Sequence, residues 1–547
     1  MIKQKEILLE IKNLYIDGFT GEQWVPIIKG VDLELRKGEV LGLIGESGAG
    51  KSTMGAAAMG YARDGTRISD GSINFSGIDL TTASEKQKRS LRGAKIAYVA
   101  QSAAASFNPA HKIIEQHTEA PRFHNLMTKS ESEADAIDLY NRLQLPYPNE
   151  IGFRYPHQVS GGQLQRAMTA MAMSCRPDLI IFDEPTTALD VTTQIEVLAA
   201  IRDIVDQFQT AAIYITHDLA VVAQMADRIK VLLKGEEVEE ETTKHMLIAP
   251  KKDYTKSLWA VRSYKRDQKS RPSSSNSLIS LQSINASYAK GPQVLEGVSI
   301  DFFKGTTVAV VGESGSGKST TARCISGLLP PSTGSILFDG DKLPLSFKDR
   351  TKNQLQQIQM IYQMADTALN PKIKIKDIIG RPAKFYEGFQ GKKLEKRVDQ
   401  LLELIELEPD LYRDRLPPEL SGGQKQRIGI ARALAANPSF IICDEVISAL
   451  DQLVAEEILK LLDNLQKEFD FTYMFITHDL ATVRAIADEV VVMQDGKVVE
   501  QGAKNEMFNP PHHPYTDLLL SSIVEMDPNW LTNVLDKRKY QISGKGN

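Results

Sequence analysis

The feature that most constrains this chain is an internal duplication that spans nearly all of its 547 residues. The motif around Lys51 recurs 267 positions later, and a serine-glycine-glycine motif recurs after 261 positions, as Ser160 and Ser421. An acidic pair and a threonine-histidine-aspartate motif recur at the same 261-residue spacing. A repeat of this length indicates two homologous domains rather than a solenoid of short units.

Each half contains the pattern G-x-x-x-x-G-K-[ST], a loop whose backbone N–H groups cradle phosphate oxygens ahead of a helix N-terminus. The lysine is a charge for the β- and γ-phosphates, and the serine hydroxyl is a ligand for Mg²⁺. We therefore predict two sites that bind ATP and Mg²⁺. The predicted nucleotide-binding residues of the two loops are Gly45, Glu46, Ser47, Gly48, Ala49, Gly50, Lys51, Ser52 and Thr53, and Gly312, Glu313, Ser314, Gly315, Ser316, Gly317, Lys318, Ser319 and Thr320.

Short apolar runs alternate with helical segments in both halves, which indicates an α/β fold with a parallel sheet buried on both faces. The predicted strands are residues 40–44, 179–182 and 211–215 in the first half and 307–311, 440–443 and 472–476 in the second. Each ends at a polar motif, and ligands bind at the carboxyl ends of such strands. Apolar stripes at helical spacing, around Tyr140 and Leu401, predict a helical subdomain inserted in each half.

A polar, serine-rich segment at 263–277 divides the halves and is predicted to be a solvated linker. We predict a first domain over 1–262, a second over 278–527 and a tail over 528–547. The basic residues 265–271 lie in this linker.

Composition excludes several classes of protein. No apolar run approaches the roughly 18 residues needed to cross a bilayer, and the N-terminus lacks the pattern of a secretory signal. The net charge of −5 gives no reason to expect a nucleic-acid partner. The three cysteines, Cys175, Cys324 and Cys443, are too far apart for a CxxC zinc site and are expected to be buried thiols.

The pentapeptides Val159-Ser160-Gly161-Gly162-Gln163 and Leu420-Ser421-Gly422-Gly423-Gln424, each upstream of an acidic strand end, resemble the signature of ATP-binding-cassette (ABC) transporter ATPases. The resemblance covers almost the whole chain. It implies two P-loop NTPase domains of the ABC type, each with a RecA-like parallel-sheet core and an inserted helical subdomain. It also implies that the halves meet head to tail within one molecule, so that each ATP lies between one loop and the opposite signature.

The resemblance assigns roles to residues that follow the strands. Its predicted catalytic residues are Glu184 and Glu445, which would polarise water, with His217, His478, Gln101 and Gln363. Its predicted metal ligands are Ser52, Gln101, Asp183, Ser319, Gln363 and Asp444. The signature residues Ser160, Gly161, Gly162, Gln163, Ser421, Gly422, Gly423 and Gln424 would bind nucleotide, and Asp190 and Asp451 would line the seam.

Adenine in this family stacks on an aromatic residue upstream of the loop. Tyr288 is the candidate in the second half. In the first half we choose Phe19, with Tyr15 and Trp24 as alternatives. A core aromatic residue is the competing interpretation for both.

The second half departs from the family pattern at Val446, where a proline usually follows the glutamate, as Pro185 does in the first half. Because no reactive group is lost, we predict two active sites.

The segment His513-Pro514-Tyr515-Thr516 resembles the C-terminal extension of ATPases that serve dipeptide, oligopeptide and nickel importers, and Asp253-Tyr254-Thr255 is a weaker copy. The resemblance implies import of a small peptide or related compound through two separate membrane permease subunits and a solute-binding protein. The chain would then lie at the cytoplasmic face of the inner membrane. The alternatives are a soluble tandem ATPase that acts on ribosomes or DNA, and a regulatory nucleotide switch.

Overall fold

The structure is a computed structural model that describes residues 6–186, 189–260, 266, 268–269, 277–289, 291–448 and 450–543. The chain divides into two compact units, of which the first comprises Met1–Ala260 with Val524–Asn547 and the second Val261–Ile523. Each unit repeats the same architecture.

The first unit is built on a six-stranded sheet in the order β10-β9-β3-β8-β7-β6, parallel except for β10 at its edge. Strands β7 and β8 are buried throughout, as their apolar sequences predict. The strands of this sheet are β3 (Val40–Ile44), β6 (Ile96–Val99), β7 (Leu179–Asp183), β8 (Ala211–Ile215), β9 (Arg228–Leu233) and β10 (Glu236–Thr242).

A second, antiparallel sheet in the order β2-β1-β4-β5 packs its apolar face on the core of this unit. Its strands are β1 (Ile7–Phe19), β2 (Trp24–Arg36), β4 (Thr66–Phe75) and β5 (Ile78–Asp79).

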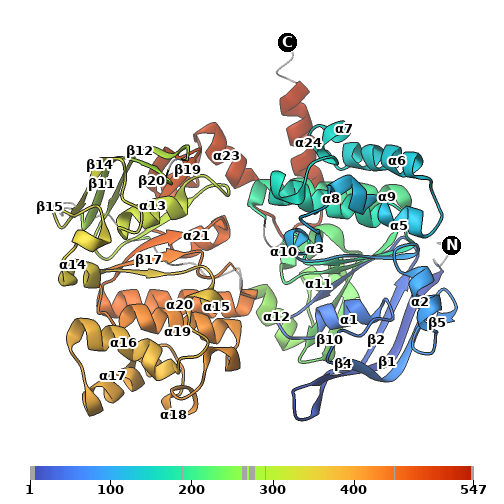
Figure 1. Cartoon of the computed structure of the whole chain (residues 1–547), viewed down its shortest axis with the longest axis horizontal. Helices are drawn as coiled ribbons and strands as arrows, with labels where there is room; N and C mark the ends of the chain where they lie inside the picture. The colour runs from blue at the N-terminus through green and yellow to red at the C-terminus, as the bar shows by residue number, and fades with distance from the viewer. Residues whose placement is uncertain are drawn as a thin grey trace. The chain divides into compact units, whose positions relative to one another are not determined.

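Helices complete the first unit, among them α6 (Figure 1). This helix contains the predicted stripe and buries Ala136 and Tyr140. The helices are α1 (Lys51–Ala57), α2 (Glu85–Leu91), α3 (Ala103–Ser106), α4 (Ile113–His117), α5 (Glu119–Phe123), α6 (Lys129–Arg142), α7 (Pro148–Ile151), a 3₁₀ turn (Pro156–Gln158), α8 (Gly161–Met173), α9 (Val191–Phe208), α10 (Leu219–Met225), α11 (Thr243–Ile248), α12 (Asp253–Ala260) and α24 (Trp530–Ser543).

The second unit repeats both sheets, in the orders β16-β17-β18-β13-β19-β20 and β12-β11-β14-β15. Its predicted strands agree with the structure, because β13 and β18 have the predicted bounds and β17 is one residue longer. The strands are β11 (Ile279–Ser287), β12 (Gln293–Phe302), β13 (Thr307–Val311), β14 (Thr333–Phe338), β15 (Asp341–Lys342), β16 (Ile358–Ile361), β17 (Phe440–Asp444), β18 (Thr472–Ile476), β19 (Glu489–Gln494) and β20 (Lys497–Ala503).

The helical subdomain of this unit includes α17, whose predicted stripe buries Val398, Leu401 and Leu402. The helices are α13 (Lys318–Ile325), a 3₁₀ turn (Phe347–Asp349), α14 (Lys352–Gln357), α15 (Ala365–Ala368), α16 (Ile375–Glu387), α17 (Gly391–Leu404), α18 (Pro409–Tyr412), a 3₁₀ turn (Pro417–Glu419), α19 (Gly422–Leu434), α20 (Gln452–Phe469), α21 (Leu480–Ile486), α22 (Lys504–Met507) and α23 (Pro514–Ser521).

The C-terminal segment belongs structurally to the first unit, whereas the sequence suggested only a tail after the second. Trp530, Leu531 and Val534 are buried in the core of the first unit, and α24 packs on α9 (Figure 1). The side-chain amide of Gln224 donates to the carbonyls of Glu525 and Asp527, both at 2.8 Å, and accepts from the N–H of Leu531 at 3.0 Å. The chain therefore leaves the first unit once and returns to it.

The linker also differs from its predicted solvated state where it is described. The Arg266 side chain is 6% exposed and pairs with Asp463 at 3.2 Å and Asp488 at 2.5 Å in the second unit. The backbone N–H of Lys269 donates to the same Asp488 at 2.8 Å. The remainder of the linker, apart from Gln268 and Ser277, lies outside the described residues.

Among the helices that the structure describes, none is long and apolar enough to cross a membrane. Cys324 and Cys443 are buried as predicted, and Cys175 is only half-buried.

Candidate nucleotide-binding sites

Each glycine-rich loop lies between the central strand of the sheet and a helix that begins at the motif lysine. Gly45 has φ of +149°, and a side chain there would place its Cβ 2.1 Å from the carbonyl oxygen of Leu232. Gly312 repeats this geometry, with φ of +148° and the Met493 carbonyl oxygen at 2.1 Å. Only glycine fits these two positions, which explains the first residue of the motif.

The motif lysines are buried beneath their loops. Lys51 Nζ donates to the carbonyls of Gly45 and Glu46, each at 2.8 Å. Lys318 Nζ donates to Gly312 at 2.8 Å and Glu313 at 2.7 Å. Both ammonium groups are thus fixed where a loop-bound phosphate would be placed.

Two of the three predicted metal ligands lie together in each half, whereas the third, Gln101 or Gln363, donates to the neighbouring glutamate, Glu184 or Glu445. Ser52 Oγ donates to Asp183 Oδ1 at 2.8 Å, and Ser319 Oγ donates to Asp444 Oδ1 at 3.0 Å. Burial raises the pKa of Asp444, although the Ser319 hydrogen bond opposes the shift. Hydroxyl and carboxylate oxygens are the ligands that Mg²⁺ takes, so the residues fit this ion.

Sequence reasoning missed Tyr98 as a residue of the first site. Its hydroxyl donates to Asp183 Oδ2, and Arg63 Nη2 lies 3.7 Å from the same oxygen. Burial, with help from Asp183, raises the pKa of Tyr98 well above its ordinary value. The corresponding residue 262 positions later is Met360, so this contact distinguishes the two halves. The signal for this contact in the sequence was a tyrosine on β6, the strand that pairs with β7 and its terminal aspartate.

The predicted catalytic residues form a cluster around each glutamate. Gln101 Nε2 donates to Glu184 Oε2 at 2.8 Å, and His217 Nδ1 lies 3.0 Å from Glu184 Oε1. In the second half, Gln363 Nε2 donates to Glu445 at 2.6 Å, and His478 Nδ1 lies 3.6 Å from Glu445. The structure therefore brings each predicted glutamine, glutamate and histidine together.

Burial and charge act against each other at these pairs. Burial would lower the pKa of His217, but the hydrogen bond and charge of Glu184 outweigh it and raise the pKa. At His478 burial likewise lowers the pKa, but the hydrogen bond and the charge of Glu445 together outweigh it and raise the pKa. For Glu445, burial would raise the pKa, but the contact with His478 and the charge of Lys318 lower it. Both glutamates also have positive φ, +50° at Glu184 and +49° at Glu445, a backbone conformation that concentrates at functional sites.

The signature serines begin helices α8 and α19. Ser160 accepts from the N–H of Gln163 at 3.3 Å, and Ser421 accepts from Gln424 at 3.3 Å, which completes a capping box in each helix. The two glycines of each signature are required for different reasons. A side chain on Gly161 would meet nothing within 4 Å, whereas one on Gly162 would meet Thr193 at 2.1 Å.

The second half shows the same division. A side chain on Gly422 would make only an ordinary contact, with Leu450 at 3.8 Å, whereas one on Gly423 would meet Val454 at 2.4 Å. The first glycine thus leaves the helix N-terminus accessible, and the second allows the helix to pack on α9 or α20. Asp190 and Asp451 cap those two helices.

Of the predicted adenine-stacking residues, Tyr288 lies against the loop helix of the second half. Its hydroxyl is 3.2 Å from Thr320 Oγ1 and accepts from Arg323 at 2.9 Å, while 39% of the residue is exposed. Phe19 is 50% exposed and packs on Trp24, with ring centroids 5.3 Å apart. The assignments of Tyr288 and Phe19 to adenine stacking both stay predictions.

The fold and the paired sites define a class of protein, tandem P-loop ATPases. The sequence matches the family described as ABC transporter over residues 28–187 and 295–448, so the chain belongs to the ABC transporter ATPases, and it binds and hydrolyses ATP. Residues 499–543 match the family described as oligopeptide/dipeptide transporter, C-terminal region.

The similarity to relatives extends over nearly the whole chain. It is 36% identical to the glutathione import ATP-binding protein GsiA of Salmonella choleraesuis, over 95% of this chain and 90% of that protein. It is 35% identical to GsiA of Pectobacterium atrosepticum, over 97% and 91%. Among solved structures it is similar to cbiO1 of Clostridium perfringens, with a TM-score of 0.40 and 32% identity over 43% of this chain and 91% of that one.

Proposed function

We propose that the chain is the ATP-hydrolysing subunit of an importer for a di- or oligopeptide or a related compound such as glutathione. The observation that carries this proposal is the combination of two complete ATPase clusters with an oligopeptide/dipeptide C-terminal region. The relatives, which are glutathione import proteins, favour the same class of solute. They argue against the alternative of an ATPase that acts on ribosomes or DNA.

Import requires partners that this chain does not supply. We propose two membrane permease subunits and a solute-binding protein, with the chain attached peripherally at the cytoplasmic face of the inner membrane. The relatives, which are import proteins, support this arrangement, and the acidic net charge gives no reason to expect a nucleic-acid partner.

In this proposal Mg²⁺ is held by Ser52 and Asp183 in one site and by Ser319 and Asp444 in the other. The ion would neutralise charge on the β- and γ-phosphates. Each glutamate, Glu184 or Glu445, accepts a proton from water that its neighbouring histidine and glutamine help to position. The short distances within each cluster support these roles.

We further propose that each loop is completed by the signature of the other half, as an intramolecular head-to-tail dimer. The accessible helix N-terminus at Gly161 and at Gly422 supports this, because such an end binds anions. Cysteines at Ser47 and Ser421, in a background with Cys175→Ser, should cross-link when ATP is trapped. Cysteines at Ser47 and Ser160, in the same half, are the control and should not. The reverse pattern would disprove the head-to-tail arrangement.

Uptake of labelled peptides tests the proposed function. Host cells that lack this chain should lose uptake of labelled dipeptide, tripeptide or glutathione and regain it with the parental chain. A chain carrying both Glu184→Gln and Glu445→Gln should not restore it. ATPase activity that responds to ribosomes or DNA, and not to host membranes, would instead support the soluble alternative.

A further inference from the structure

A tyrosine from the C-terminal extension of each half reaches the glycine-rich loop. The hydroxyl of Tyr515 accepts from the backbone N–H of Glu313 at 2.9 Å, and that of Tyr254 accepts from Glu46 at 3.2 Å. Glu46 and Glu313 are the second residues of the two loops. The same contact thus occurs twice, although the segments around Tyr254 and Tyr515 differ in sequence.

The residues before Tyr515 set the start of its helix. Pro514 occupies the first turn of α23, where its missing N–H costs no hydrogen bond, and His513 Nδ1 accepts from the N–H of Tyr515 at 3.2 Å. The histidine-proline-tyrosine order therefore begins a helix and fixes Tyr515, its second residue. Tyr515 is buried, with 6% of the residue exposed.

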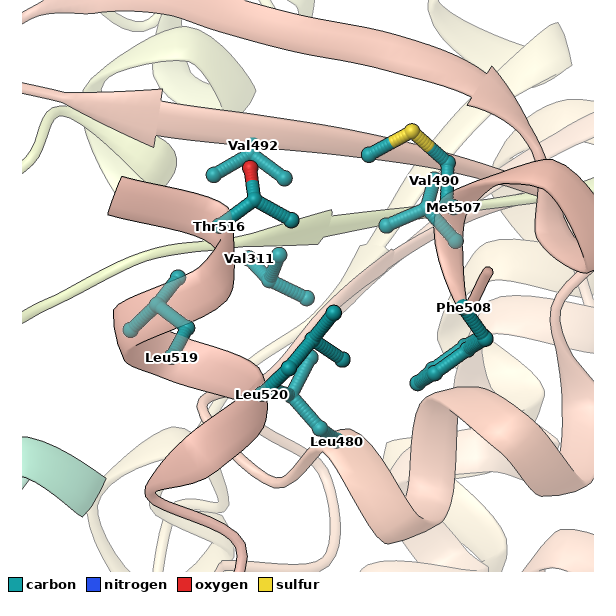
Figure 2. Close-up of a pocket in the computed structure, with 9 residues that line it drawn as sticks. All are labelled: Val311, Leu480, Val490, Val492, Met507, Phe508, Thr516, Leu519 and Leu520. Carbon is teal, nitrogen blue, oxygen red and sulfur yellow. The ribbon is translucent and has the colours of Figure 1, made fainter. Parts of the chain in front are cut away.

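Apolar side chains around a small pocket pack α23 against the strand that leads into the loop. Figure 2 shows Thr516 and Leu519 of α23 facing Val311 and Val492 of the sheet. Val311 is the last residue of β13 and directly precedes Gly312. The helix is thus anchored beside the loop independently of the Tyr515 hydroxyl.

The tyrosine and the motif lysine together hold one peptide plane of the loop. In a trans peptide the C=O of Gly312 and the N–H of Glu313 point in opposite directions. Lys318 Nζ holds the carbonyl at 2.8 Å while Tyr515 holds the N–H at 2.9 Å. Rotation of this peptide would break both bonds.

We propose that Tyr515 and Tyr254 are positioning residues that keep the glycine-rich loops in their nucleotide-binding conformation, and so connect each C-terminal extension to its ATP site. The role concerns ATP binding and does not depend on which solute is transported. Tyr515 should have the larger effect, because it is more deeply buried and its hydrogen bond is shorter.

The test is Tyr515→Phe in the full chain, which removes one hydroxyl and keeps the ring. The matched control is the next residue, Thr516→Val, because the Thr516 hydroxyl is buried, lines the apolar pocket and has no hydrogen-bond partner in the described structure. We expect Tyr515→Phe to raise the KM for ATP and the Kd for a fluorescent ADP by about two- to tenfold, the effect of one hydrogen bond, with kcat changed less. Thr516→Val should leave both constants at parental values.

Thermal unfolding without nucleotide separates this role from a structural one. Tyr515→Phe and Thr516→Val should unfold at similar temperatures, and only Tyr515→Phe should show a reduced increase in Tm on addition of ADP. Tyr254→Phe should act in the same direction and more weakly, and the two tyrosine substitutions together should exceed either alone. Parental nucleotide affinity in the double variant, or equal losses in Tyr515→Phe and Thr516→Val, would overturn the proposal.

Discussion

Removal of the Arg266 side chain should destabilise the second unit strongly, although the residue belongs to a segment with the composition of a linker. Arg266 pairs with Asp463 and Asp488, whose side chains are 4% and 1% exposed. Asp488 also accepts from the N–H of Thr307, at the start of β13, at 2.8 Å. Arg266→Ala would leave the Asp488 carboxylate buried without its cation, whereas Asp463 would keep Lys467 at 2.7 Å. Breaking a buried ion pair by removal of one partner costs about 3–5 kcal/mol.

Cysteine labelling can report this loss for each unit separately. Cys324 and Cys443 are buried in the second unit, while Cys175 belongs to the first. When refolding is faster than labelling, the labelling rate follows the unfolded population. A loss of about 3–5 kcal/mol should therefore accelerate labelling of Cys324 and Cys443 by about 100- to 4,000-fold, since about 1.4 kcal/mol corresponds to a factor of ten.

An exposed ion pair in the second unit provides the control. Lys304→Ala removes an ion pair with Asp470 in which both side chains are more than 60% exposed, which is worth about 0–1 kcal/mol. Labelling of Cys175 should stay at the parental rate in both variants. The reasoning fails if Arg266→Ala labels Cys324 and Cys443 no faster than Lys304→Ala does.

Three further predictions concern the active sites and the C-terminal helix. Glu184→Gln and Glu445→Gln should each lower phosphate release, and together by about 10²–10⁴-fold, with equilibrium ATP binding retained; unchanged turnover in the double variant would exclude these bases. Because Glu184 raises the pKa of His217, that pair stabilises the fold fully below the unfolded histidine pKa and loses its effect as the pH rises through the folded value. Glu184→Gln should therefore shift the His217 titration, followed by NMR, to lower pH, and an unchanged or raised value would contradict the pairing. Leu531→Ala should cost about 2–5 kcal/mol of docking of α24, seen as a red shift of Trp530 fluorescence, whereas exposed Thr532→Ala should not change the emission.

Local patterns predicted which site residues come together, because the motifs lie at strand ends. The bounds of β3, β8, β13 and β18 agree with the apolar runs, and the sheet then brings each aspartate, glutamate and histidine to one edge. The clusters around Glu184 and Glu445 follow from this topology, as parallel strands end at a common edge.

Contacts between segments that are distant in the sequence could not be predicted from local patterns. Arg266 lies in a polar stretch, and nothing local identifies Asp463 and Asp488, about two hundred positions away, as its partners. The C-terminal helix buries Trp530, Leu531 and Val534, a spacing that suits a helix face, but the pattern does not say which unit it covers. Tyr98 was missed because a tyrosine within an apolar run has the composition of a core residue.

The geometry of the two sites also bears on Val446, which stands where the family usually has a proline after the glutamate. Pro185 restricts the backbone after Glu184, whereas Val446 is a flexible substitute that is 2% exposed. If the proline were needed to hold the glutamate, the conformation of Glu445 would differ, yet the φ angles are +50° and +49°. Val446 is buried in the core of the second unit, and Pro185 is likewise buried in the first. The His478–Glu445 distance is 3.6 Å, against 3.0 Å in the first half, and this difference is larger than that between the two glutamine–glutamate distances. Since both glutamates keep their glutamine and their histidine, we expect both sites to hydrolyse ATP, with unequal rates that follow from the histidine contact rather than from the missing proline.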